Sequence, residues 1–308
     1  MFKTLFTLVA LSWAGLLVSS AQAKSLALDK FYQTFQGSPV ILQQDLGKRP
    51  IYLKFWASWC LDCREQMPDL EAVYNQYRDA LAIYAVNLNI NETPKTLQAI
   101  KDKYHLTLPI VLDHNGSLAS NFQFVGSPFH VLINAQGKVV YTTYHADATL
   151  HRKLDQLAHH SLVADSSAAA QVSPNVSRPD LPKGLVLRYF TATWCDSYFV
   201  DIEPAMASNC RHADALVKEL YQQLPDANWQ GYATHLWSSP EDLKKFRASH
   251  SVQYPLSMDA HNETARKFQV NHYPTLIVFK DGKEIKRLTH FGQPAQIQKS
   301  LVNLINAN

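Results

Sequence analysis

Two cysteines three residues apart follow directly on a run of apolar residues, and this arrangement constrains the fold more than any other feature. Residues 51–56 (Ile-Tyr-Leu-Lys-Phe-Trp) have the character of a buried strand, and Cys60 and Cys63 open an amphipathic helix. The first sulfur therefore lies near free backbone N–H groups and the positive end of the helix dipole, which stabilise a thiolate. One helical turn separates the sulfurs, so they can close and reopen a small disulfide ring. The pattern predicts a redox-active pair.

The first 23 residues have the features of a secretory signal peptide. Lys3 supplies a basic start, residues 5–18 are apolar, and Ala-Gln-Ala at 21–23 is a small-x-small cleavage site. We expect a mature chain that begins at Lys24 and lies in the periplasm, which we favour over full secretion; an uncleaved membrane anchor is the alternative. No later stretch approaches the roughly 20 apolar residues of a transmembrane helix, so we expect no such segment after cleavage.

The formal net charge of +3 is too small and too scattered to indicate nucleic acid as a partner. The four cysteines are too few for a disulfide scaffold in an exported chain of this size. The 13 histidines show no ligand spacing, and a single Cys-x-x-Cys lacks the second pair that a zinc site needs. We therefore expect no metal, and no cofactor apart from the redox-active disulfide Cys60–Cys63.

Strands and helices alternate in the pattern of residues 51–160, which predicts an α/β fold with a mixed central sheet and helices on both faces. The helix that starts at Cys60 contains Pro68, which should kink it. The strands are expected at 51–56, 82–89, 109–113, 129–134 and 138–144, and the helices at 60–77, 93–104, a short one ending near Phe122, and 148–160.

The second half of the chain repeats the first. Residues 185–195 repeat 51–60 with the Trp-Cys pair displaced by 135 positions, whereas 254–259 and 273–274 mirror 108–113 and 127–128 with a displacement of 146. The difference places 11 extra residues between Cys195 and Pro255. We predict two domains in tandem, at 24–160 and 184–308, after the signal peptide 1–23 and joined by a linker at 161–183.

Residues 55–68 resemble the active-site signature of thioredoxin-fold proteins of the TlpA/ResA type, which are periplasmic thiol:disulfide oxidoreductases. Three spaced landmarks agree: Trp59 before the cysteine pair, Pro68 five residues after it, and Pro128 ahead of a strand and a Gly137 hairpin. The resemblance implies two thioredoxin-like domains in tandem.

The resemblance also implies substrate-binding residues. In the family the proline that matches Pro128 is cis, and the residue before it presents its backbone to the substrate beside the cysteines. We assign this role to Ser127 and Pro128. Trp59 is expected to contact substrate at the rim of the site or to pack beside the motif.

Three departures from the family pattern bear on proton transfer and redox potential. Leu61 and Asp62 replace the usual proline between the cysteines, and a carboxylate so close disfavours a thiolate, which predicts a reducing couple. Gln66 follows Glu65 where many relatives have a glutamate, and Lys54 occupies the position of thioredoxin's buried acid. Neither proton acceptor of the family is therefore assigned.

The second copy lacks its resolving cysteine, because Tyr198 occupies that position after Cys195. Cys210 is the remaining candidate partner, and one straight helix would hold the two about 22 Å apart. A disulfide therefore requires a loop at residues 196–203 and a helix that begins at Pro204. Two outcomes stay open: a Cys195–Cys210 disulfide, structural or slowly exchanging, or two thiols of which Cys195 alone reacts.

We expect the first domain to reduce protein disulfides through Cys60 and Cys63, with a membrane electron donor of the DsbD type, implied by the family, to reduce the pair again. The second domain keeps Tyr273 and Pro274 and is expected to bind substrates or partners, or to hold an auxiliary disulfide site. One alternative is a client-binding or chaperone-like protein in which the redox pair is secondary. Another is a disulfide isomerase, which would need a dimer.

Overall fold

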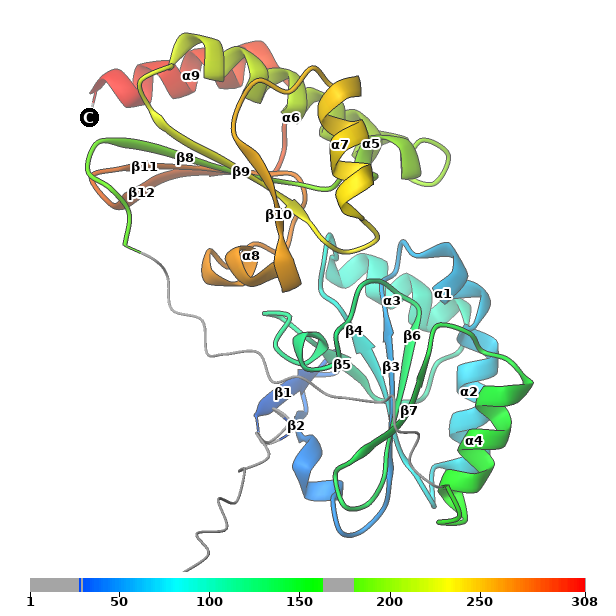
Figure 1. Cartoon of the computed structure of the whole chain (residues 1–308). Coiled ribbons are helices and arrows are strands. Elements are labelled where there is room, and N and C mark those ends of the chain that lie inside the picture. The colour runs from blue at the N-terminus through cyan, green and yellow to red at the C-terminus, as the bar shows by residue number, and fades with distance from the viewer. Residues whose placement is uncertain (1–27, 29, 163–179, 308) are drawn as a thin grey trace, which may run out of the picture.

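The computed structural model describes residues 28, 30–162 and 180–307, so the predicted signal peptide and most of the predicted linker lie outside the described residues. Two mixed sheets, each with its own helices, form two units along the chain (Figure 1). The boundaries predicted for the domains stay predictions. Among the described residues, no helix combines the length and the apolar character needed to span a membrane.

The first unit is built on a sheet of seven strands in the order β2-β1-β5-β4-β3-β6-β7. β3 lies inside this sheet; its six residues are all buried, and it pairs parallel with β4 and antiparallel with β6. The strands are β1 (Phe31–Thr34), β2 (Pro39–Ile41), β3 (Ile51–Trp56), β4 (Ala82–Asn87), β5 (Ile110–Leu112), β6 (Phe129–Ile133) and β7 (Val139–Thr143).

The longer helices of the first unit pack on one face of this sheet. Leu70, Leu97 and Leu150, one from each, share a core with Tyr52 of β3. The opposite face, which includes Phe55, is covered by two short 3-10 helices. The helices are α1 (Leu61–Glu65), α2 (Met67–Tyr77), α3 (Pro94–Lys103), α4 (Ala148–Ala158), η2 (Leu42–Asp45) and η3 (Ala119–Asn121).

The helix predicted at 60–77 is interrupted, as its proline indicated. It divides at Gln66 into α1 and α2, and Pro68 lies in the first turn of α2, where its missing N–H costs no hydrogen bond. The hairpin β1–β2 was not predicted; β1 adds antiparallel to β5 and widens the sheet.

The second unit has five strands in the order β10-β9-β8-β11-β12, which matches the order of the five strands β5-β4-β3-β6-β7 in the first. Helices α6, α7 and α9 cover one face and α8 the other (Figure 1). The elements are β8 (Leu185–Thr191), α5 (Cys195–Tyr198), α6 (Pro204–Gln223), β9 (Asn228–Thr234), α7 (Pro240–Ser249), β10 (Leu256–Asp259), η4 (Ala260–Asn262), α8 (Glu263–Lys267), β11 (Thr275–Lys280), β12 (Lys283–Leu288) and α9 (Pro294–Ala307).

Candidate active site

The cysteine pair lies where β3 ends and α1 begins. Cys60 and Cys63 form a disulfide with an S–S distance of 2.05 Å and a Cα–Cα distance of 5.2 Å. Cys60 is the N-cap of α1, and its Sγ accepts a hydrogen bond from the backbone N–H of Cys63 at 3.2 Å. The arrangement favours negative charge on the first sulfur once the bond is reduced, because a backbone donor and the helix terminus both face it.

The loop before β6 lies beside this pair. The Ser127–Pro128 peptide bond is cis, as the resemblance implied, and Ser127 Oγ is 3.3 Å from Cys63 Sγ. The structure therefore brings together the two cysteines and the two loop residues that the sequence named, although 64 positions separate Cys63 from Ser127.

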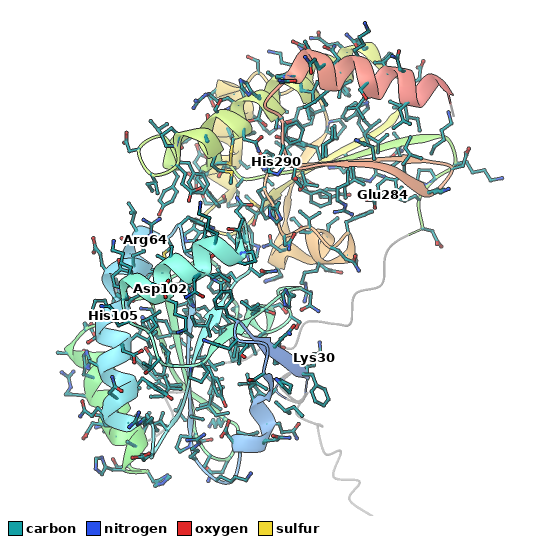
Figure 2. All side chains as sticks on the ribbon, turned by 180° about the vertical axis from the view of Figure 1, so that it is seen from behind. Lys30, Arg64, Asp102, His105, Glu284 and His290 are labelled. Carbon is teal, nitrogen blue, oxygen red and sulfur yellow. A yellow bond between two sulfur atoms is a disulfide. The ribbon has the colours of Figure 1, made fainter. Side chains whose placement is uncertain are left out.

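A buried carboxylate that the sequence analysis missed holds the loop in front of the cysteines. Glu92 accepts hydrogen bonds from the N–H and Oγ of Ser58, both at 2.6 Å, and from Asn87 Nδ2 at 2.9 Å. Arg64 donates to the Ser58 carbonyl at 2.6 Å and lies at the end of the first unit that faces the second (Figure 2). No sequence pattern marks Glu92, because it follows β4 in an irregular segment.

A second buried network lies on β3 and β6. His130 contacts Tyr52 Oη at 2.7 Å and Gln66 Oε1 at 3.1 Å. Lys54, which is fully buried, has no hydrogen-bond partner at its Nζ. Burial lowers the pKa of Lys54 to about 7, against the attraction of Asp69. Burial also lowers the pKa of His130, with Lys54 adding to the effect.

In the second unit Cys195 and Cys210 form a disulfide, with a Cα–Cα distance of 6.0 Å. The alternative of two free thiols is thus excluded for this state of the chain. A helix begins at Pro204, as predicted, but the expectation of a loop throughout 196–203 is wrong, because α5 forms one turn from Cys195 to Tyr198 before the chain bends. The Tyr273–Pro274 bond is cis, and the Tyr273 carbonyl lies 3.9 Å from Cys195 Sγ.

The two units meet through the faces that carry these cysteines. Trp59 stacks on Trp194 with ring centroids 5.3 Å apart, and Trp237 packs edge-on against both rings. Trp59 is 3% exposed and Cys60 is 4% exposed. Of the two expectations for Trp59, the structure provides packing beside the motif, and the partner in that packing is the second unit.

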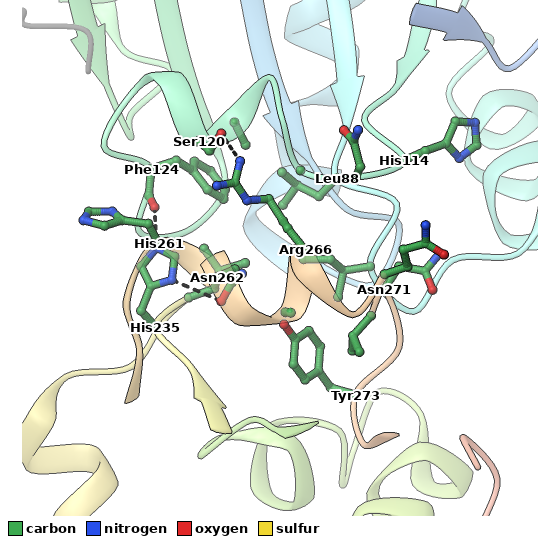
Figure 3. Close-up of a pocket in the computed structure, with 18 residues that line it drawn as sticks. Leu88, His114, Ser120, Phe124, His235, His261, Asn262, Arg266, Asn271 and Tyr273 are labelled. Atoms are coloured by element: carbon green, nitrogen blue, oxygen red, sulfur yellow. Dashed lines mark hydrogen bonds between the residues drawn. The ribbon is translucent and has the colours of Figure 1, made fainter. Parts of the chain in front are cut away.

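A pocket also lies between the units (Figure 3). His235 reaches across it to donate to the Phe124 carbonyl at 2.9 Å, and Arg266 donates to Ser120 Oγ at 2.8 Å. Burial lowers the pKa of His235. The cavity measures about 60 Å³, room for a few water molecules but not for a peptide segment. Among the described residues, no three His, Cys, Asp or Glu side chains gather as metal ligands.

Known proteins resemble this chain in sequence. The profile of the Redoxin family matches residues 22–157. Thioredoxin-like protein YneN of Bacillus subtilis is 32% identical over 131 residues, which cover 42% of this chain and 75% of YneN. Thiol-disulfide oxidoreductase ResA of Halalkalibacterium halodurans is 30% identical over 122 residues, covering 40% of this chain and 68% of ResA.

The solved structure of StoA from Bacillus subtilis aligns with a TM-score of 0.36 and 25% identity, over 42% of this chain and 93% of StoA. YneN and ResA each align over more than two thirds of their own length. The residues that match the Redoxin family include the complete Cys-x-x-Cys signature, Cys60 to Cys63. At this identity and coverage, the chain belongs to the Redoxin family, among the thioredoxin-fold thiol-disulfide oxidoreductases of the TlpA/ResA type.

Proposed function

We propose that this oxidoreductase is exported to the periplasm and works as a reductase of protein disulfides, with Cys60 as the nucleophile and Cys63 as the resolving thiol. The position of Cys60 as the N-cap of α1, with the Cys63 N–H directed at its sulfur, carries the assignment. A thiolate is the attacking species in disulfide exchange, and this is the sulfur whose surroundings favour one.

The reaction starts from the dithiol form. The Cys60 thiolate attacks one sulfur of the substrate disulfide, and the other substrate sulfur leaves as a thiolate and takes up a proton. The Cys63 thiolate then attacks Cys60 Sγ in the mixed disulfide and releases the second substrate thiol. Two electrons have passed to the substrate, and the Cys60–Cys63 disulfide seen in the structure is the product.

The substrate segment binds along the loop that ends in Ser127 and Pro128, with Trp59 beside it. The distance of 3.3 Å between Ser127 Oγ and Cys63 Sγ supports this position, because a chain held along that loop brings its own sulfur to the cysteine pair. A membrane electron donor of the DsbD type then returns the pair to the dithiol form. The second unit, with Cys195–Cys210 and Tyr273–Pro274, binds the partner or serves as an auxiliary site.

Insulin reduction tests the proposal. Wild type should accelerate the precipitation of insulin B chain in the presence of a thiol reductant, and Cys60→Ser should abolish the acceleration. Cys63→Ala should accumulate mixed disulfides, whose partners identify the natural clients. Equal behaviour of wild type and Cys60→Ser would instead favour a client-binding protein in which the redox pair is secondary.

A redox titration tests the direction of the reaction. Asp62 lies in the first turn of α1 beside the nucleophile, where its charge opposes the thiolate. The midpoint should therefore lie toward the reducing values of thioredoxin, about −270 mV, and a midpoint near about −120 mV would contradict a reductase. Sequencing the N-terminus of protein from a periplasmic fraction tests export and should give Lys24 as the first residue.

A further inference from the structure

The contacts between the two units are reciprocal. The backbone N–H of Trp237 donates to the Val125 carbonyl at 2.7 Å, and the backbone N–H of Asn91 donates to the Asn271 carbonyl at 2.9 Å. Asn91 and Trp237 are 146 positions apart, as are Val125 and Asn271. The loop after β4 therefore binds the loop before the cis proline of the second unit. The loop after β9 binds the loop before the cis proline of the first unit in the same way.

Side chains make a second pair of reciprocal hydrogen bonds, to the residues directly before the two cis prolines. Trp237 Nε1 donates to the Ser127 carbonyl at 3.1 Å, and Asn91 Nδ2 donates to the Tyr273 carbonyl at 3.0 Å. The Tyr273 N–H also donates to Asn91 Oδ1 at 2.7 Å. The resemblance assigns to Ser127 the role of presenting its backbone to the substrate. In the state described, the Ser127 carbonyl is already hydrogen-bonded to Trp237.

Trp237 is held in an unusual conformation for this contact. Its φ of +53° lies in the left-handed region, which large side chains rarely adopt. Its indole lies so close to Gly126 that a Cβ there would come within 2.7 Å of the ring. The contact therefore holds a bulky residue in a backbone conformation that costs free energy.

The second unit also covers the cysteines from the side of α1. The Tyr198 hydroxyl accepts a hydrogen bond from the Leu61 N–H at 3.1 Å and lies 3.5 Å from the Trp59 carbonyl. Trp194 and Trp237 pack against the ring of Trp59, the residue before Cys60, and Cys60 is 4% exposed. Because a disulfide must approach the attacking sulfur in line, so little exposure disfavours exchange with a client in the state described.

We propose that the loop 235–237 of the second unit is an internal competitor, which occupies the surface of residues 125–127 and Trp59 where the proposed function places an extended segment of a disulfide-bonded client protein. The inference rests on the proposed function for the nature of the client. An N–H to carbonyl hydrogen bond at an exposed backbone edge is how extended peptides are recognised, and the Trp237 N–H makes that bond here. The client therefore binds when the two units separate.

Alkylation of Cys60 measures this separation without any client. In a Cys63→Ala background Cys60 is a single thiol, and Cys195–Cys210 remains closed. Trp237→Ala, which removes the indole, and Asn91→Ala, which weakens the reciprocal contact, should each raise the rate of reaction with iodoacetamide at least about fivefold, because the reactive fraction is the open fraction. Asn75→Ala, an exposed asparagine on α2, is the matched control and should react like the parent.

Asn91→Ala makes the test decisive, since Asn91 hydrogen-bonds to the second unit and not to the edge 125–127. Rates within about twofold of the parent for both variants, with circular dichroism unchanged, would overturn the proposal. Faster alkylation in both variants supports it, whether or not insulin is reduced. If neither wild type nor Trp237→Ala reduces insulin but the variant is alkylated faster, the proposed reductase function is contradicted. The proposal that the loop 235–237 covers the client surface is then still supported.

Discussion

Lys54 lies fully buried in the central strand, and its ammonium group has no hydrogen-bond partner. Its register partner on the neighbouring strand β6 is His130. Burial lowers the pKa of His130 as well. Two groups that would carry positive charge are thus adjacent in a buried environment, which favours the neutral form of both. Because the pKa of Lys54 falls from 10.5 to about 7, its charge state changes within the physiological range of pH.

Lys54→Met should stabilise the protein, and the gain should depend on pH. The folded pKa is below the unfolded one, so folding releases a proton between about pH 7 and 10.5, and wild-type stability rises with pH across that window. The variant lacks this cost. Its advantage over wild type should be about 3–5 kcal/mol below pH 7 and should shrink as the pH rises toward 10, as measured by urea unfolding at several pH values.

Lys138→Met is the control for this experiment, because Lys138 is exposed on the hairpin between β6 and β7. It should show no pH-dependent gain. A Lys54→Met advantage that stays constant from pH 6 to pH 10 would show that the buried amine keeps its proton in the folded protein over this range.

Glu92→Ala should destabilise the first unit by about 2–3 kcal/mol, because several donors lose a charged acceptor in a buried position. The donors are the Ser58 N–H and hydroxyl, Asn87 Nδ2 and Thr96 Oγ1. Urea unfolding followed by circular dichroism measures the effect, and Glu65→Ala, an exposed glutamate in α1, serves as the control. Equal stability of the two variants would mean that Glu92 does not hold the loop in front of the cysteines.

At the scale of elements, the sequence predicts what a local pattern determines. β3 runs from Ile51 to Trp56 as expected, because its six buried side chains are apolar or aromatic at every position except Lys54. β1 and β2 were missed because they contain four and three residues, too few for alternation to be distinguished from chance. β1 pairs with β2 in a hairpin and with β5, and the pairing with β5 is a contact remote in sequence that no local pattern reports.

The break between α5 and α6 could be predicted only in outline. The distance argument required that the chain bend before Pro204, and it does, so that Cys195 and Cys210 reach each other. That argument could not show that α5 would form a turn first. Its residues Cys195 to Tyr198 gain from packing against α6 and the first unit, which no local pattern reports.

Cys195→Ser with Cys210→Ser should lower the free energy of unfolding by about 2–4 kcal/mol, since the disulfide closes a loop with a sequence separation of 15 residues. Urea unfolding of the air-oxidised protein measures the change. Insulin reduction by the double variant should equal that of wild type if the bridge is structural. If the double variant stays folded but no longer reduces insulin, Cys195 and Cys210 take part in electron transfer to the substrate.

At the scale of the whole molecule, the contacts that decide access to the active site join residues far apart in sequence. Asn91 and Tyr273 are separated by 182 positions, and nothing near either of them indicates a partner. The displacement of 146 relates Asn91 to Trp237, but an asparagine and a tryptophan share no chemistry that would mark them as equivalent. The cysteine pair was evident from the sequence, whereas the surface that covers it was not.

Hydrogen exchange should show that the amides of Asn91 and Trp237 open together. Both donate across the contact between the units, so a single separation exposes both, whereas β3 amides require unfolding of the sheet. We expect equal protection for the two loop amides and far greater protection in β3. In Asn91→Ala, exchange of the Trp237 amide should accelerate at least about threefold, because the coupling is reciprocal.

Exchange of Trp237 that is unaffected by Asn91→Ala would show that the two loops open independently. Asn75→Ala, on the surface of α2, should leave both amides at their wild-type rates.

The stacked tryptophans have one further consequence. Trp59 lies against Trp194, its own counterpart in the second unit, and Ser120 lies against Arg266, which is 146 positions away. Residues that meet their own counterparts mark the axis of a twofold dimer. This chain carries the geometry of such a dimer within one polypeptide, where the covalent connection between the units sets a high effective concentration and the pairing does not depend on dilution. The pairing of the two halves therefore does not require a complete cysteine pair in both, and the second half has Tyr198 where the first has Cys63.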